Sequence, residues 1–180
     1  ITNSVEDVIV ARDIIMTKEA GARLHLCHCS TADSVTLVEM AHKQGLKVTA
    51  EVCPHHFTMS DDEITEDDGR FKMNPPLRSK EDVAALKEGL KNGIMEVIST
   101  DHAPHGAEEK AQSMKKAPFG IVGLETSFAI GYTELVQKGI LTLSQLVEKM
   151  SVNPAKVLGI DKGNLAEGKK ADIAIADIST

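Results

Sequence analysis

The chain has 180 residues, of which 42% are hydrophobic and 26% are charged, and its formal net charge is −7. This composition is typical of a globular protein and excludes extended disorder. The acidic balance and a total of only five aromatic residues argue against a nucleic-acid-binding surface.

Targeting signals are missing from the sequence. No stretch approaches the roughly 20 consecutive apolar residues of a membrane helix, and residues 1–4 lack the features of a signal peptide. The three cysteines form an odd set without a secretory context, so we expect a reduced, cytoplasmic compartment. Because Ile1 replaces a starting Met, we expect the chain to be processed or to be a piece of a longer protein.

The first predicted element is a helix that starts at a capping box, Ser4 to Asp7, and ends before Gly21. Its expected apolar face consists of Val8, Ala11 and Ile15.

Short apolar runs then alternate with helix signals. Strands are predicted over 24–29, 47–53, 96–100 and 171–177, and helices over 32–44, 79–92 and 124–138, with two more starting at 142 and 153. Residues 60–68 form an acidic loop and residues 102–120 a long, lysine-rich loop. Asn153 followed by Pro154 indicates a helix cap. We expect the strand at 171–177 to belong to a separate sheet.

The repeated strand-helix order predicts an α/β fold with parallel strands and helices outside. Three such units fit either a doubly wound sheet or part of a (β/α)8 barrel. A complete barrel takes about 250 residues, so in a barrel the missing strands would precede Ile1.

Polar, metal-capable residues follow three predicted strands. They are His28 after the first, Cys53-Pro54-His55-His56 after the second, and Asp101 to His105 after the third. Because the carboxyl ends of parallel strands meet at one edge of a sheet, we expect these residues to share one site.

Several of the seven histidines also have simpler interpretations. His25 and His28 should point to opposite faces of a strand, so we discount His25. We expect His42 to be solvated on its helix. His55 and His56 are interpreted as structural.

Cys27 and Cys29 are spaced C-x-C without a second pair, so they are interpreted as buried packing residues and not as a zinc knuckle. Asp101 fits a helix cap or a functional carboxylate equally well. Asn74 precedes two prolines that fix the backbone, which suits either a loop brace or a positioned amide. Gly120 should let backbone N–H groups approach a ligand. The residues alone predict a metal-dependent or acid/base enzyme.

Five segments together carry a family resemblance: residues 28–31, 49–56, 72–78, 99–105 and 118–126. In this order they resemble the dihydroorotases, in particular the bacterial class whose barrel holds a zinc centre. Residues 163–177 resemble the closing strand pattern of the wider amidohydrolase superfamily. The resemblance implies that residues 1–160 are the C-terminal part of a (β/α)8 TIM-type barrel, with about three βα units. Residues 161–180 would then start a small C-terminal β-sandwich.

The resemblance also implies roles for individual residues. His28 takes the position of a zinc ligand, and Asp101 that of the catalytic aspartate that also approaches the metal. The implied substrate-binding positions are Asn74, His105 and the backbone at Phe119 and Gly120. His55 and His56 match a family motif without an assigned role.

The implied reaction is the reversible, zinc-dependent cyclisation of carbamoyl-aspartate to dihydroorotate in pyrimidine synthesis, with one or two zinc ions. Asp101 would transfer the proton. The implied partners are the small-molecule substrate, a second copy of the chain and an aspartate transcarbamoylase, with neither nucleic acid nor membrane. Two alternatives remain open, a hydantoinase- or allantoinase-like enzyme and an inactive scaffold for a transcarbamoylase.

The chain departs from the family pattern because it contains no His-x-His pair. The resemblance places that pair, a bridging carboxylate and a further histidine on earlier strands. We therefore expect the chain to be a fragment of the enzyme that is inactive alone. An incomplete barrel exposes apolar surface, so we also expect it to aggregate or to pair.

Overall fold

The computed structural model describes residues 1–178, and within that range three short parallel strands form the sheet. They are β1 (Leu24–Leu26), β2 (Val48–Val52) and β3 (Val97–Ile98), in the order β1-β2-β3. Leu24 pairs with Val48, and Glu51 pairs with Val97. The α/β class with parallel strands is confirmed, although the first and third strands are shorter than predicted.

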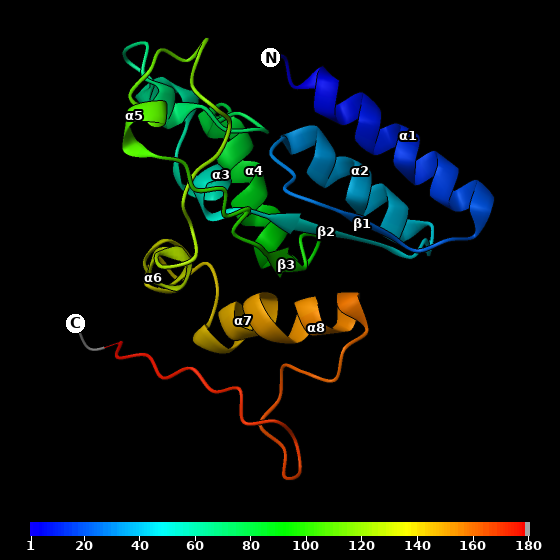
Figure 1. Cartoon of the computed structure of the whole chain (residues 1–180). Helices are drawn as coiled ribbons and strands as arrows, with labels where there is room; N and C mark the ends of the chain where they lie inside the picture. Colours follow the sequence, from blue (N-terminus) through cyan, green and yellow to red (C-terminus); the bar gives the residue numbers. More distant parts are fainter. Residues whose placement is uncertain (179–180) are drawn as a thin grey trace.

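Three long helices form where the sequence predicted them, one before β1 and two between the strands. They are α1 (Ser4–Ala20), α2 (Ala32–Lys43) and α4 (Lys80–Lys91). Figure 1 shows α1 and α2 running beside each other along the strands, and α1 contacts both α2 and β1. The α4 helix starts at a capping box between Ser79 and Asp82, as its sequence predicted.

The alternation of β2 separates two environments. Val48, Ala50 and Val52 are buried, whereas Thr49 and Glu51 are half-buried. The buried set joins one core with side chains from the helices, which include Val38, Ala41, Leu86, Leu90 and Leu146. Period-2 patterning therefore positions β2 with its apolar face on the helices and its polar face, which carries Glu51, on the other side.

The remaining helical elements are short. They are α3 (Pro54–Thr58), η1 (Asp61–Glu63), η2 (Gly69–Phe71), α5 (Ala107–Lys110), α6 (Ser127–Gly131), η3 (Tyr132–Val136), α7 (Leu143–Val147), η4 (Glu148–Val152) and α8 (Asn153–Leu158). The loop predicted over 102–120 thus contains one helical turn. The helix predicted from 124 begins at Ser127 and continues as the π-helical segment η3.

Asn153 is not a helix cap, contrary to the prediction. The α7, η4 and α8 segments follow one another without a break, and Val152 before Asn153 has helical φ and ψ of −67° and −49°. The Asn153 amide instead donates to the carbonyl of Glu96 at 2.9 Å. It therefore ties this helix to the start of β3, and tertiary contact replaces the local cap.

The first helix also differs from its prediction in two respects. Asn3 and not Ser4 is its N-cap, and no side chain caps it. The buried residues are Val10, Ile14 and Thr17. Val8 and Ile15, predicted to face the core, are 65% and 66% exposed. Apolar residues occur around much of this helix, so spacing alone could not select the packed face.

His42 is not solvated as expected. Its Nε2 atom lies 2.9 Å from the Val48 carbonyl and 3.3 Å from Glu96 Oε1. A polar residue on a helix near a strand start thus finds partners on the strands.

No strand forms over 171–177, although the sequence alternates apolar and polar residues there. Figure 1 shows the chain after α8 descending into a loop and then running back in extended form below α7 and α8. Ile175 is 96% exposed. An alternating segment becomes a strand only beside another strand, and residues 159–178 are not part of the sheet. The end of the predicted sandwich segment, 179–180, lies outside the described residues.

Among the described residues, no helix combines the length and the apolar character needed to cross a membrane.

Candidate active site

His28 and Asp101 share an unusual backbone conformation at the ends of β1 and β3. His28 has φ of +41° and Asp101 has φ of +47°, and within residues 1–178 they are the non-glycine residues with positive φ. This left-handed region costs an L-residue about 1–2 kcal/mol, and such strain concentrates at functional sites. The two predicted metal-ligand positions are therefore the two places where the fold holds a side chain against its backbone preference.

Glu51 holds the His28 turn in place from the neighbouring strand. Its Oε1 atom accepts from the His28 backbone N–H at 3.2 Å, and its Oε2 atom lies 3.1 Å from His25 Nε2. Burial raises the pKa of Glu51, but hydrogen bonds from His25, the His28 backbone and Ser99 outweigh burial and lower it. Glu51 is therefore an ionised anchor, which the sequence analysis missed because a lone glutamate in a strand carries no motif.

The argument that discounted His25 was wrong. β1 ends at Leu26, so strand alternation does not extend to His28. His25 lies on the polar face of the sheet, with Nδ1 at 2.8 Å from Thr49 Oγ1. Through Glu51, His25 belongs to the support of the His28 turn.

A second network fixes the residues that follow His28. The Glu6 carboxylate accepts from the Ser30 backbone N–H at 2.7 Å and from the Ser34 hydroxyl at 2.9 Å, and it is in close contact with the Ser30 hydroxyl. Arg78, buried with 5% exposure, donates to Ser30 Oγ at 3.0 Å and reaches Glu6 at 3.3 Å. The acidic first turn of α1 thus holds the loop after β1 and does not cap its own helix.

The three strand ends influence one another electrostatically. Burial raises the pKa of the Cys53 thiol, and the negative charges of Asp101 and Glu51 raise it further. For Cys27, burial again comes first, followed by Glu51 and Asp101. The charge of Asp101 thus acts on thiols at the ends of both other strands. Cys27 itself is exposed, contrary to its interpretation as a buried residue.

A cavity of about 440 Å³ joins two of the predicted residues. Its lining includes His25, His28, Asn74 and Arg78. Asp101, His105 and the 119–120 backbone do not line it. The described residues thus bring His28 and Asn74 together at one cavity, and leave the predicted residues of the long loop to one side.

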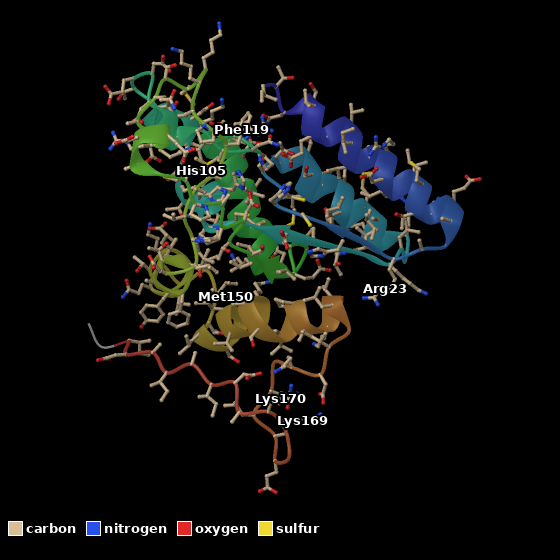
Figure 2. All side chains as sticks on the ribbon, viewed as in Figure 1. Arg23, His105, Phe119, Met150, Lys169 and Lys170 are labelled. Atoms are coloured by element: carbon tan, nitrogen blue, oxygen red, sulfur yellow. The ribbon has the colours of Figure 1, made fainter. Side chains whose placement is uncertain are left out.

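His105 and Phe119 are neighbours in the loop between β3 and α6, as Figure 2 shows. The Nε2–H of His105 donates to the Phe119 carbonyl at 2.8 Å. His105 is exposed and Phe119 is 50% exposed. This hydrogen bond leaves Nδ1 of His105 as the nitrogen that can face a ligand.

Gly120 does not present its N–H to a ligand as expected, because that group donates to the Lys72 carbonyl at 3.0 Å. With φ of +144°, the glycine instead lets the loop pack on Ala103, where a Cβ atom would collide. Lys110 completes this packing by donating to the carbonyls of Lys72, Pro118 and Gly120 at 2.8–3.1 Å. The role of Gly120 is therefore to allow close packing of this loop on Ala103.

His102 is a further loop anchor that the sequence analysis missed. Its Nδ1 atom accepts from the backbone N–H of Gly123 at 3.0 Å. Its position directly after Asp101 was the available signal.

The donor set suits a metal of borderline softness. His28 offers an imidazole nitrogen and Asp101 a carboxylate, which are ligand types that zinc accepts. His25, Cys27 and Glu51 form an adjacent group whose ligand atoms lie within 4.8 Å of one another. Glu51 and His25 are already hydrogen-bonded to each other, so we assign this group a supporting role.

Comparison with known proteins identifies the family of the chain. The model of the amidohydrolase family matches residues 3–179. The dihydroorotase of Bacillus thuringiensis (strain Al Hakam) is 53% identical over 173 residues, which are 96% of this chain and 40% of that protein. The dihydroorotase of Bacillus cereus (strain B4264) is 52% identical over the same length. The chain therefore spans about 40% of the length of these curated relatives.

Solved structures share the fold. Dihydropyrimidinase from Brevibacillus agri NCHU1002 superposes with a TM-score of 0.89 at 31% identity, over 94% of this chain and 39% of that one. L-hydantoinase from Arthrobacter aurescens gives a TM-score of 0.86 at 37% identity, over 92% and 38%. With parallel strands ending in strained His28 and Asp101 and a family match along nearly its whole length, the chain belongs to the amidohydrolase family.

Proposed function

We propose that the protein containing this chain is a dihydroorotase, which interconverts carbamoyl-aspartate and dihydroorotate. The observation that carries the proposal is the strained backbone of His28 and Asp101 at the ends of two parallel strands. The 53% identity to the Bacillus dihydroorotase supports this substrate class.

His28 and Asp101 would hold zinc, together with ligands from outside this chain, and one or two ions fit the proposal. When bound, the metal would polarise the ring carbonyl and lower the pKa of a bound water molecule to near neutrality. Glu51 keeps His28 oriented through the turn's backbone N–H.

Asp101 would move the proton in both directions. Its exposed carboxylate accepts a proton from the attacking water and returns it to the departing ring nitrogen, as general base and then general acid. Asn74, beside the same cavity as His28, would bind the substrate's amide or carboxylate groups. His105 and the backbone at Phe119 and Gly120 lie in the loop that follows β3, and they would bind the substrate from that side.

The architecture of the whole protein is part of the proposal. Residues 1–160 would form three βα units of a (β/α)8 barrel, and residues 161–180 would enter a small β-sandwich. The parallel β1-β2-β3 order and the alternation of apolar and polar residues over 171–177 support this assignment. We further propose a cytoplasmic homo-oligomer that can associate with an aspartate transcarbamoylase.

The test is an assay of the intact protein with dihydroorotate, comparing Asp101→Asn with the matched exposed variant Glu108→Gln. Asp101→Asn should lower kcat by about 10²- to 10⁴-fold because the amide cannot take up the proton. Glu108→Gln, on the same loop segment, should leave kcat unchanged. Full activity in Asp101→Asn would reject the assignment.

A hydantoinase or dihydropyrimidinase activity is the second candidate, because the matched solved structures carry those names. Dihydroorotate bears a carboxylate that hydantoin and dihydrouracil lack. Turnover of dihydroorotate at a kcat/KM well above that of the two uncharged rings supports the first proposal, and the reverse order supports the second. If none of the three rings is turned over and the protein holds no zinc, the scaffold role is favoured.

A further inference from the structure

A compact group of metal-capable side chains lies at the start of α3. Cys53 is the residue before this helix, and His55 and His56 are inside it. The sulfur atom and one nitrogen from each ring lie within 4.8 Å of one another. Cys53 is fully buried, His56 is 2% exposed and His55 is 6% exposed. The donor atoms therefore meet inside the protein and not at its surface.

The α3 helix also carries buried polar atoms that lack a hydrogen-bond partner. Within residues 1–178, the buried side-chain nitrogen and oxygen atoms without a hydrogen-bond partner are His55 Nε2, His56 Nδ1 and Thr58 Oγ1. Burying such an atom without a partner is unfavourable, and native proteins rarely leave one unpaired. Two unpaired imidazole nitrogens beside a buried thiol indicate a missing ligand.

A hydrogen bond to a backbone carbonyl decides which nitrogen of His56 is bare. Its Nε2 atom lies 2.9 Å from the Pro75 carbonyl, which can only accept, so Nε2 carries the proton. Nδ1 is then the bare nitrogen. Metal-binding histidines typically donate their other N–H to a backbone carbonyl in this way. Burial also lowers the pKa of His56 to about 4 and that of His55 to about 3, so both rings are neutral at pH 7.

The donor types distinguish a metal ion from a water molecule as the missing ligand. A sulfur atom within 4.8 Å of two imidazole nitrogens suits a thiophilic cation, whereas a thiol forms only weak hydrogen bonds to water. A divalent ion displaces the thiol proton on binding, so metal uptake should release a proton. One thiolate and two neutral imidazoles form a donor set that zinc prefers.

We propose that Cys53, His55 and His56 form a buried binding site for a thiophilic divalent cation such as Zn²⁺. Its donor set shares no residue with the His28 and Asp101 pair, so the proposal goes beyond the enzymatic function and does not depend on it.

The test uses the intact protein, freed of metal by a chelator and loaded with Co²⁺ as the probe. A thiolate ligand gives cobalt a sulfur-to-metal charge-transfer band in the near ultraviolet, which nitrogen and oxygen ligands do not give. We expect this band in the wild type and its loss in Cys53→Ser and in His56→Asn, with about one Co²⁺ fewer bound per chain.

Two matched controls make the result specific. Cys29→Ser also places a hydroxyl at a buried position, since Cys29 is 2% exposed, and Cys27→Ser removes the thiol beside His28. Both should keep the band. A band lost in Cys27→Ser and kept in Cys53→Ser would overturn the proposal.

A measurement on the wild type removes the dependence on variants that fail to fold. X-ray absorption at the zinc edge of the zinc-loaded protein should show a sulfur neighbour at about 2.3 Å. Only nitrogen and oxygen neighbours, or no cobalt band at saturation, would mean that water occupies the group and that the proposal is wrong.

Discussion

Backbone strain at His28 and Asp101 is the most informative feature at the scale of single residues. Their positive φ values are those that glycine adopts freely, yet a functional side chain stands at each. Glu51 and Glu6 supply the hydrogen bonds that hold the His28 segment in this conformation.

Comparing glycine with alanine at either position should reveal the backbone strain as a difference in the free energy of unfolding. His28→Gly should be more stable than His28→Ala by about 1 kcal/mol, and Asp101→Gly more stable than Asp101→Ala by a similar amount, because glycine relieves the left-handed strain. Urea denaturation of each pair measures the difference. At Lys43, in an α-helix, the order should reverse, with alanine more stable than glycine by about 1 kcal/mol. Equal stabilities within both strained pairs would show that the turns carry no strain.

Gly120 gives a second prediction at this scale. Gly120→Ala should lower the free energy of unfolding by about 1–3 kcal/mol more than Gly93→Ala, because a Cβ atom at residue 120 collides with Ala103. Both glycines have positive φ, and a Cβ atom at Gly93 meets nothing within 4 Å, so the comparison isolates the collision. Thermal unfolding of the two variants, together with the KM for substrate, provides the check. Similar losses of stability in the two variants would mean that the positive φ alone accounts for the destabilisation.

At the scale of elements, Asp82 joins the starts of three helices. Its carboxylate accepts from the Asn3 side chain at 3.0 and 3.1 Å, from the Ala32 backbone at 2.8 Å and from Ser79 Oγ at 2.9 Å. Burial raises the pKa of Asp82, and these hydrogen bonds outweigh burial and lower it below the ordinary value. The sequence predicted the α4 cap, but the contacts to α1 and α2 are tertiary.

Asp82→Asn should lower the free energy of unfolding at pH 7 by about 2 kcal/mol, since an amide cannot accept all these bonds. Because the folded pKa is depressed, the stabilisation by Asp82 is present above pH 3.8 and is lost as pH falls through the folded pKa. The difference between wild type and variant should therefore shrink in acid. Urea unfolding at pH 7, 5 and 3 tests this. Glu81→Gln, an exposed neighbour on α4, should change stability little at every pH. A constant difference for Asp82→Asn would contradict the linkage.

At the scale of the whole molecule, α1 presents an apolar surface outward. Val5, Val8, Ile15 and Met16 are each more than half exposed. Contiguous exposed apolar surface marks an interaction site or an aggregation hazard.

We expect the chain to self-associate through this surface, and we expect Val8→Glu with Ile15→Glu to reduce the association. Light scattering across a concentration series measures the apparent mass, which should fall toward that of one chain in the double variant. The free energy of unfolding should change little, since both side chains face solvent. Val10→Glu is the matched control, because Val10 is 5% exposed and a charge there should unfold the protein. A concentration-independent single-chain mass in the wild type would refute the expectation.

Sequence alone determined the elements whose signals are local. The helix starts near residues 79 and 142, the glycine after α1 and the strand β2 are each encoded within a few residues, and each formed as predicted. The strand-helix order fixed the parallel α/β class, because parallel strands need crossovers. Motif order then indicated the family, and the match over residues 3–179 confirmed it.

Only the tertiary structure decided the rest. The buried face of α1, the partners of Asn153 and the role of Glu51 depend on groups that are distant in sequence, and local spacing contains no information about them. The left-handed turn at His28 is held by Glu51 from the neighbouring strand. The strand expected at 171–177 did not form because alternation supplies a face and not a hydrogen-bonding partner.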